Sequence, residues 1–163
     1  MPAVIAAERP DSPDAVALIE ELDAYLIPLY PIEAHYGYDV EKLLRRDVAF
    51  FVIRVDGVAA GCGGVQLVGT ERGSSVEEPY GEIKRMYVRP AFRGQGLAKL
   101  MLAHLAGYVQ ERGIGLLRLE TGIYQPEAMS LYERYGFQRT GAFGDYPVDG
   151  AYNVFYELYL TAV

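Results

Sequence analysis

A glycine-containing turn at residues 93–98 is the segment of this sequence best suited to hold a ligand. It reads Arg93-Gly94-Gln95-Gly96-Leu97-Ala98 and joins a predicted strand to a predicted helix. Backbone N–H groups at a helix N-terminus are unpaired and bind phosphate oxygens well. Gly94 and Gly96 carry no side chain that would keep a ligand away, and Arg93 adds positive charge. The turn therefore predicts a cradle for a pyrophosphate group.

The charge around this turn differs from the charge of the whole chain. The 163 residues carry a formal net charge of −7 at pH 7. Residues 82–99 instead contain one acid, Glu82, and five bases, which are Lys84, Arg85, Arg89, Arg93 and Lys99. A short basic segment in an acidic chain favours a local anionic ligand over nucleic acid or an anionic membrane surface.

Two common phosphate-binding motifs do not fit the turn. A Walker A loop needs Lys and then Ser or Thr after its last glycine, but Leu97 and Ala98 follow Gly96. A dinucleotide-binding fingerprint needs a third glycine where this chain has Lys99. The turn instead resembles the R/Q-x-x-G-x-G/A signature of the GNAT superfamily of N-acetyltransferases.

Other segments extend this resemblance over residues 48–137. Residues 82–88, Glu-Ile-Lys-Arg-Met-Tyr-Val, look like the fourth strand of the family. Residues 128–137, Ala-Met-Ser-Leu-Tyr-Glu-Arg-Tyr-Gly-Phe, are similar to its A-x-x-L-Y-E-x-x-G-F element. Residues 119–122 and 143–146 further resemble a bacterial subgroup of small GNAT enzymes.

The resemblance implies a mixed α/β fold, the GNAT acyl-CoA N-acyltransferase fold, as one domain over residues 1–163. Its central mixed sheet has splayed strands and is flanked by helices. The pantetheine arm of acetyl-CoA, the co-substrate, would pair with the backbone of Met86 and Val88. The amides of residues 93–98 would hold the pyrophosphate. Gln125 stands where relatives often have an asparagine that contacts CoA.

The same resemblance suggests two catalytic side chains. Tyr132 is similar to the family tyrosine that protonates the departing sulfur, and packing on an amphipathic helix is the alternative. Glu82 is a candidate general base, 11 residues before Arg93, as in the histone-modifying branch of the family. An ion pair with Lys84 or Arg85, or a position on a solvated strand face, is an equal alternative, and water would then relay the proton. The backbone N–H of Met86 or Tyr87 is the candidate donor to the oxyanion.

The acceptor-binding residues are expected in two loops. Tyr30, Glu33 and His35 lie in the loop that usually covers the acceptor, although a solvated loop is equally consistent with them. Tyr146 is expected to line the cleft from the other side. Residues 8–41 contain nine acids and one base, which is compatible with a cationic amine. The sequence does not identify the acceptor.

These residues predict an acetyl-CoA-dependent N-acetyltransferase that acts on a primary amine of a small molecule or peptide. The alternative is a non-catalytic acyl-CoA-binding module with the same fold, and a nucleic-acid-binding protein is disfavoured by the acidic charge. No metal is expected. The aromatic-rich strand predicted at 152–160 is a candidate homodimer interface. One cysteine, no signal peptide and no long apolar run predict a cytoplasmic protein with no membrane segment.

Local patterns place these residues on secondary structure. Ser12-Pro13 and Asp39 are predicted to begin helices that end near Leu26 and Arg45. The other helices are expected to end at Gly113, after beginning near Leu97, and at Gly136, after beginning at Pro126. The predicted strands cover residues 48–55, 58–68, 80–88, 114–121, 137–140 and 152–160. Asp56-Gly57 predicts a hairpin, and the glycines at 61, 63 and 64 predict a bulge.

Overall fold

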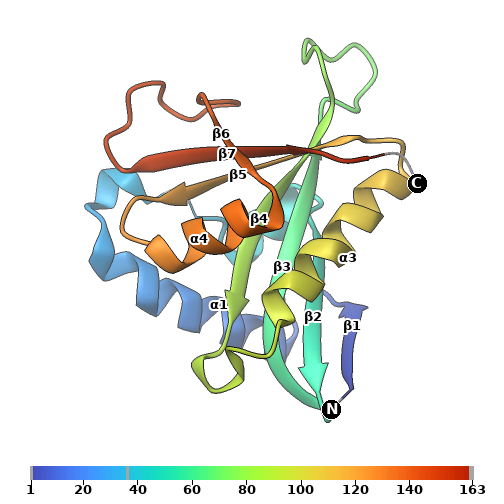
Figure 1. Ribbon diagram of the computed structural model, residues 1–163, viewed down its shortest axis with the longest axis vertical. Helices are drawn as coiled ribbons and strands as arrows, with labels where there is room; N and C mark the ends of the chain where they lie inside the picture. Colours follow the sequence, from blue (N-terminus) through green and yellow to red (C-terminus); the bar gives the residue numbers. More distant parts are fainter. Residues whose placement is uncertain (1, 36, 162–163) are drawn as a thin grey trace.

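The computed structural model describes residues 2–35 and 37–161, and its centre is a seven-stranded mixed sheet (Figure 1). The sheet order is β1-β2-β3-β4-β5-β7-β6. The strands are β1 (Ala3–Ala7), β2 (Ala49–Val55), β3 (Val58–Val68), β4 (Tyr80–Val88), β5 (Leu116–Gly122), β6 (Gln138–Thr140) and β7 (Asn153–Tyr159). The helices are α1 (Pro13–Leu26), α2 (Val40–Arg45), α3 (Leu97–Glu111) and α4 (Pro126–Tyr135), with 3₁₀ turns η1 (Ile27–Leu29), η2 (Ile32–Ala34) and η3 (Pro90–Phe92).

The helix starts predicted from capping residues are confirmed. The Ser12 hydroxyl accepts a hydrogen bond from the Ala15 N–H at 3.1 Å, and the Asp39 carboxylate accepts one from the Lys42 N–H at 2.8 Å. Each bond satisfies an N–H that has no partner inside its helix. The predicted ends near Leu26, Arg45, Gly113 and Gly136 also agree with the structure to within two residues.

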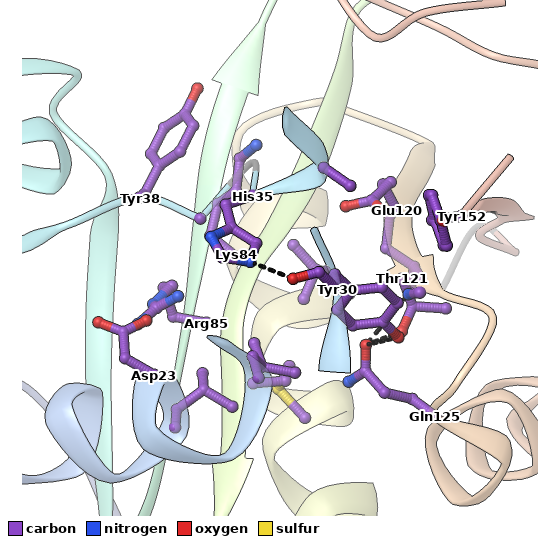
Figure 2. Close-up of a pocket in the computed structure, with 18 of the residues that line it drawn as sticks. Asp23, Tyr30, His35, Tyr38, Lys84, Arg85, Glu120, Thr121, Gln125 and Tyr152 are labelled. Atoms are coloured by element: carbon purple, nitrogen blue, oxygen red, sulfur yellow. Dashed lines mark hydrogen bonds and ion pairs between the residues drawn. The ribbon is translucent and has the colours of Figure 1, made fainter. Parts of the chain in front are cut away.

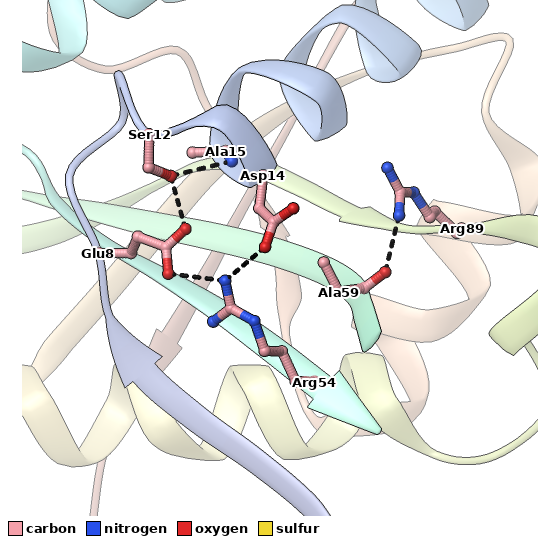
Figure 3. Close-up of polar contacts among 7 residues, drawn as sticks. All are labelled: Glu8, Ser12, Asp14, Ala15, Arg54, Ala59 and Arg89. Carbon is pink, nitrogen blue, oxygen red and sulfur yellow. Dashed lines mark hydrogen bonds and ion pairs between the residues drawn. The ribbon is translucent and has the colours of Figure 1, made fainter. Parts of the chain in front are cut away.

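An ion-pair network fixes the start of α1 to the edge of the sheet (Figure 3). The guanidinium of Arg54 on β2 donates to the carboxylates of Glu8 at 2.9 Å and Asp14 at 2.7 Å. The same Glu8 side chain accepts a hydrogen bond from the Ser12 hydroxyl at 2.5 Å. These contacts connect the end of β1, the cap of α1 and β2, the strand next to the edge strand β1.

The helices cover both faces of the sheet with separate apolar clusters (Figure 1). On one face, Leu18 of α1 and Leu43 of α2 pack on Val52 and Cys62. On the other face, α3 and α4 pack on β2, β3 and β5 through a larger cluster, which includes Met101, Leu102, Leu105, Leu117 and Tyr132. In the described residues, no helix has the length and apolar character that crossing a membrane requires.

The predicted bulge in β3 is confirmed, because the β3–β4 register shifts between Cys62 and Gly64. A Cβ atom on Gly63 would lie 2.8 Å from side-chain atoms of both Met101 and Met86. The missing side chain therefore lets α3 approach the sheet beside the point where β4 bends. Arg85, in the middle of β4, has a φ of 57°, which marks the same irregularity.

Strands β4 and β5 separate after a short parallel contact, which confirms the predicted splayed sheet. They pair only at Gly81↔Leu117 and Glu82↔Arg118, whereas β5 pairs with β7 over its full length. Beyond residue 82 the two strands diverge, and one edge of β4 is left without a neighbouring strand (Figure 1).

The first strand was not predicted. β1 pairs antiparallel with β2 from Ala3↔Val55 to Ala7↔Phe51. Its five residues are mainly small, and an edge strand buries only part of one face, so the local pattern is weak. Its position depends on pairing with a segment about 50 residues away in the sequence.

Candidate active site

One cavity lies at the N-terminus of α3, where the sequence predicts a phosphate cradle. It has a volume of about 460 Å³. Gly94 and Gly96 have φ values of 80° and 77°, and a Cβ atom on either would meet nothing within 4 Å. The predicted residues that line this cavity are Val88, Arg93, Gly94, Gly96, Leu97 and Ala98. Lys99 and Arg134 add positive charge to its wall, so the site suits an anion.

A second cavity lies between α1, the opened edge of β4 and the end of β5 (Figure 2). Its volume is about 280 Å³, and Tyr132 of α4 also lines it. Other residues of α4, namely Leu131, Arg134 and Tyr135, line the first cavity. Helix α4 therefore contributes to both cavities, and Tyr132 belongs to the second one.

Buried ion pairs hold the side chains of β4 at this second cavity. The Lys84 ammonium lies 2.6 Å from a carboxylate oxygen of Glu82 and 4.0 Å from the centre of the Tyr38 ring. The Tyr146 hydroxyl donates to the same Glu82 oxygen at 2.8 Å. Glu82 does not line the cavity itself; it contacts two residues that do. The ion pair between Glu82 and Lys84 is the alternative arrangement that the sequence left open.

Arg85 forms the second ion pair, in which the guanidinium is buried and the Asp23 side chain is 39% exposed. Its guanidinium donates to the Asp23 carboxylate at 2.5 Å and to the Ile19 carbonyl at 3.3 Å. The Nε of Arg85 is buried and makes no hydrogen bond within the described part of the chain. These contacts tie the bent part of β4 to α1, which forms the opposite wall of the cavity.

Glu120 brings a carboxyl group into the cavity from β5. The side-chain amide of Asn153 on β7 donates to it at 2.9 Å. Burial raises the pKa of Glu120 to about 7, and this effect outweighs the hydrogen bond and the charge of Lys84, which act in the opposite direction. The carboxyl group therefore changes its charge close to neutral pH.

Tyr132 is buried where α4 faces this carboxyl group. Burial, and then the negative charge of Glu120, raise the pKa of its phenol above the ordinary value. Its ring packs edge-on against Phe137 with centroids 5.7 Å apart. The hydroxyl forms no hydrogen bond with any residue that the structure describes. The phenol is therefore neutral at working pH and has a proton to donate.

Tyrosines close the outer side of the cavity. The Tyr30 hydroxyl donates to the Gln125 side-chain oxygen at 3.2 Å and accepts from the Tyr124 N–H at 3.1 Å. The Tyr30 ring stacks on Tyr124 and meets Tyr152 edge-on, with centroid distances of 5.4 and 6.1 Å. A side chain at Gly122 would clash with this ring, so glycine is required there.

The predicted site residues fall into three groups. Those at the second cavity are Tyr30, His35, Met86, Gln125, Tyr132 and Tyr146. Those at the first cavity are the six residues named above. Glu33, Glu82, Tyr87 and Gln95 line neither cavity, and the Tyr87 hydroxyl instead donates to Glu21 on α1.

Sequence reasoning did not select Glu120, Asn153, Tyr38 or Tyr152. Glu120 had one usable signal, because an acidic residue inside an otherwise buried strand needs a reason to be there. In the described residues, no group of three or more His, Cys, Asp or Glu side chains is placed to hold a metal.

Comparison with known proteins gives a consistent result. The model of the Acetyltransferase (GNAT) family matches residues 15–137. A protein of Azospirillum brasilense named IAA acetyltransferase is 41% identical over 150 residues, which cover 91% of this chain and 94% of that protein. The crystal structure of a Klebsiella pneumoniae protein classed with the acyl-CoA N-acyltransferases superimposes with a TM-score of 0.76 at 33% identity, covering 98% of both chains.

A more distant structure has the same fold. The PaiA N-acetyltransferase from Thermoplasma acidophilum, determined in complex with coenzyme A, gives a TM-score of 0.72. It is 17% identical and covers 98% of this chain and 99% of its own. At that identity, the likeness concerns the fold alone.

Proposed function

The chain belongs to the GNAT family of acetyltransferases, and from that premise we propose that it transfers the acetyl group of acetyl-CoA to a primary amine. The acceptor is a small molecule or a peptide. The amine attacks the thioester directly while both substrates are bound. The observation that carries this proposal is the pair of cavities that helix α4 lines, one of them an anion cradle and the other a site with ionisable groups.

The cradle suits the pyrophosphate of acetyl-CoA. The left-handed backbone at Gly94 and Gly96 leaves open space beside the first amides of α3. A ligand phosphate there receives N–H donors that have no partner inside the helix. The free edge of β4 then offers backbone groups to the amide-containing pantetheine arm, as an added strand would use them. Met86 and Val88 are the proposed contacts.

The second cavity suits an amine of modest size. Its volume of about 280 Å³ is just below the usual range for small-molecule sites, which begins at about 300 Å³. Tyr30, His35 and Tyr146 are the proposed acceptor contacts from the two loops.

Tyr132 is the proposed donor to the departing sulfur. It lies on the helix that lines both cavities, and its neutral phenol has no competing hydrogen-bond partner among the described residues. The backbone N–H of Met86 or Tyr87 is proposed to stabilise the oxyanion.

Thiol release tests this function directly. The protein is incubated with acetyl-CoA and a panel of primary amines, including amino acids, polyamines and short peptides, and free CoA thiol is measured. We expect amine-dependent thiol release and a mass increase of one acetyl group on the acceptor. Saturating acetyl-CoA at about 100 times its dissociation constant should raise the free energy of unfolding by about 2.7 kcal/mol.

The outcomes separate the enzyme from a non-catalytic module. Stabilisation by acetyl-CoA without thiol release for any amine would favour a protein that binds acyl-CoA and does not turn it over. No stabilisation would contradict the assignment of the cradle to CoA.

A further inference from the structure

Tyrosine is the commonest residue type in the wall of the second cavity. Aliphatic side chains from α1 and β5, such as Leu22 and Leu119, lie in the same wall. Aromatic rings and aliphatic chains bind a ligand mainly by removing its apolar surface from water. The tyrosines that line the cavity are Tyr30, Tyr38, Tyr132, Tyr146 and Tyr152.

The cations of this cavity already have partners within the protein. The Lys84 ammonium lies 2.6 Å from Glu82, and the Arg85 guanidinium lies 2.5 Å from Asp23. A charged group that has a close partner gains little from a second one. A ligand that covers the rings and aliphatic chains therefore gains more binding free energy here than a ligand that brings further charges.

The hydroxyl of Tyr30 is fixed to the turn between β5 and α4. It donates to Oε1 of Gln125 at 3.2 Å and accepts from the Tyr124 N–H at 3.1 Å. The Gly122 N–H also donates to this Gln125 oxygen, at 3.1 Å, and a backbone N–H can only donate, so the amide oxygen must face Tyr30. A Cβ atom on Gly122 would overlap the Tyr30 ring. The protein itself therefore sets the orientation of this ring.

A second ring stands beside Tyr30 at the end of β5. Tyr152 meets it edge-on, with centroids 6.1 Å apart and an angle of 82° between the ring planes (Figure 2). Two rings in this arrangement can offer a guest ring both edge-to-face and offset contacts, which attract beyond the area that they bury. Glu120 lies on the same side of the cavity, and burial raises its pKa to about 7, so these surroundings are poorly hydrated. This side of the cavity suits an aromatic group.

We propose that the acceptor is an arylalkylamine, a primary amine joined to an aromatic ring by a short alkyl chain, and that Tyr30 and Tyr152 bind its ring. This inference rests on the proposed acetyl transfer and narrows the acceptor to one class. The amine nitrogen forms the new C–N bond as the C–S bond breaks, so amine and acetyl-CoA become an N-acetylated arylalkylamine and CoA thiol. Gln125 is a positioning residue, because it acts through the Tyr30 hydroxyl and does not line the cradle.

A diamine fits the same cavity less well. Its second ammonium group would lose hydration beside carboxylates that already have donors. Asp23 pairs with Arg85, and the Asp39 carboxylate accepts the capping N–H of α2 at 2.8 Å. The Glu120 carboxyl group, with a pKa of about 7, is fully charged only above neutral pH. Arylalkylamines and diamines are therefore the two classes to compare.

The decisive experiment compares kcat/KM at pH 7 for phenethylamine, cyclohexylethylamine, hexylamine and putrescine, with saturating acetyl-CoA. Cyclohexylethylamine has nearly the size of phenethylamine but no aromatic ring, so it isolates the contribution of the ring. For the parent protein, kcat/KM for phenethylamine should exceed that for putrescine by at least about tenfold. It should exceed that for cyclohexylethylamine by about threefold.

Variants of the two rings locate the preference. Tyr30→Leu and Tyr152→Leu should each bring kcat/KM for phenethylamine and cyclohexylethylamine to within about twofold of each other, mainly through KM. Tyr159→Leu is the matched control, because it removes an exposed tyrosine of β7 that lines neither cavity, and it should keep the preference of the parent.

Gln125→Met tests the positioning role. It keeps the length of the side chain and removes the oxygen that holds the Tyr30 hydroxyl. KM for phenethylamine should rise by about threefold, while kcat and the KM for acetyl-CoA stay nearly unchanged; a general loss of stability would not separate these constants. Acetyl-CoA affinity within about twofold of the parent value shows that each variant is folded, because none of the substituted residues lines the cradle.

Each outcome bears on one claim. A kcat/KM for putrescine or cyclohexylethylamine that equals or exceeds the value for phenethylamine would overturn the aromatic class and leave the acetyl transfer intact. A parent-like preference in both Tyr30→Leu and Tyr152→Leu would overturn the role of the two rings. A parent protein that binds acetyl-CoA but acetylates no amine would contradict the proposed function, and the acceptor class with it.

Discussion

The two cavities are built in different ways. The cradle comes mainly from one continuous segment, residues 88–99, with one face of α4 added. The second cavity collects side chains from α1, the loops after it, β4, β5, α4 and the loop before β7. The first site is thus a property of a local turn, and the second exists only when the whole sheet has assembled.

The charges of the two cavities also differ. The basic groups of the cradle are exposed, as Arg93 and Lys99 illustrate, and they can be neutralised by a ligand. In the second cavity the cations Lys84 and Arg85 are buried and paired with Glu82 and Asp23, whereas the Glu120 carboxyl group forms no ion pair with a described residue. The exposed basic groups predict that an anion binds in the cradle.

In the network around Arg54, both carboxylates have a cationic partner (Figure 3). There one guanidinium serves two carboxylates, and these contacts raise the pKa of Arg54. That network lies outside both cavities. Paired charges thus occur both at structural positions and in the cavity, whereas the Glu120 carboxyl group forms no ion pair with a described residue.

Gly96→Asp should have the largest effect, because it changes the cradle itself. A carboxylate at this position would stand in the space of the pyrophosphate and repel it. We expect acetyl-CoA affinity, measured by isothermal titration calorimetry, to fall by at least about a thousandfold, or about 4 kcal/mol. The substitution also places a side chain on a backbone with a φ of 77°, which strains the fold.

Gly73→Asp is the matched control, because Gly73 has a φ of 82° and open space at its Cβ, but lies in the loop before β4. It carries the same strain and charge without touching either cavity. Equal losses of affinity in both variants would mean that the local turn is not the phosphate site.

Glu120→Gln should change the pH dependence of stability by a smaller amount. The pKa of Glu120 is raised from about 4.5 to about 7 in the folded chain, so the folded state holds this proton over a range where the unfolded state has lost it. The contribution of Glu120 to stability is therefore present at low pH and is lost as pH rises from about 4.5 to about 7.

Glutamine stays uncharged, so the variant does not lose this contribution to stability as the pH rises. Relative to the parent, the variant should gain on the order of 2–3 kcal/mol in the free energy of unfolding between pH 5 and pH 8. Urea unfolding of the ligand-free proteins at both pH values measures this. If the difference in the free energy of unfolding between the two proteins is the same at both pH values, the Glu120 carboxyl group has an ordinary pKa. The ionisable groups of both cavities would then be solvated.

The same contrast explains how far the sequence could be interpreted. Caps and breakers such as Ser12, Asp39 and Gly136 act within a few residues, so the helices were predicted closely. The cradle was predicted for the same reason. Strand β1 and the pair of Glu120 with Asn153 depend on the registers of β1 with β2 and of β5 with β7, which no local pattern contains.

Tyr132→Phe should have the smallest of these effects, and it tests the junction between the two cavities. The substitution removes one oxygen and keeps the ring that packs on Phe137. If the phenol donates to the departing sulfur, the loss appears in kcat. We expect kcat to fall by at least about tenfold, with acetyl-CoA affinity nearly unchanged, because general acid catalysis is typically worth about 10²- to 10⁴-fold and other donors compensate in part.

Tyr108→Phe on α3 is the control, because Tyr108 lines neither cavity and packs on Phe51. The raised pKa of Tyr132 makes it a weaker acid than an ordinary tyrosine, so a hydrogen bond to the sulfur is the milder form of its role. An unchanged kcat in Tyr132→Phe, under conditions where chemistry limits the rate, would remove this phenol from the mechanism. The sulfur would then depart as an unprotonated thiolate.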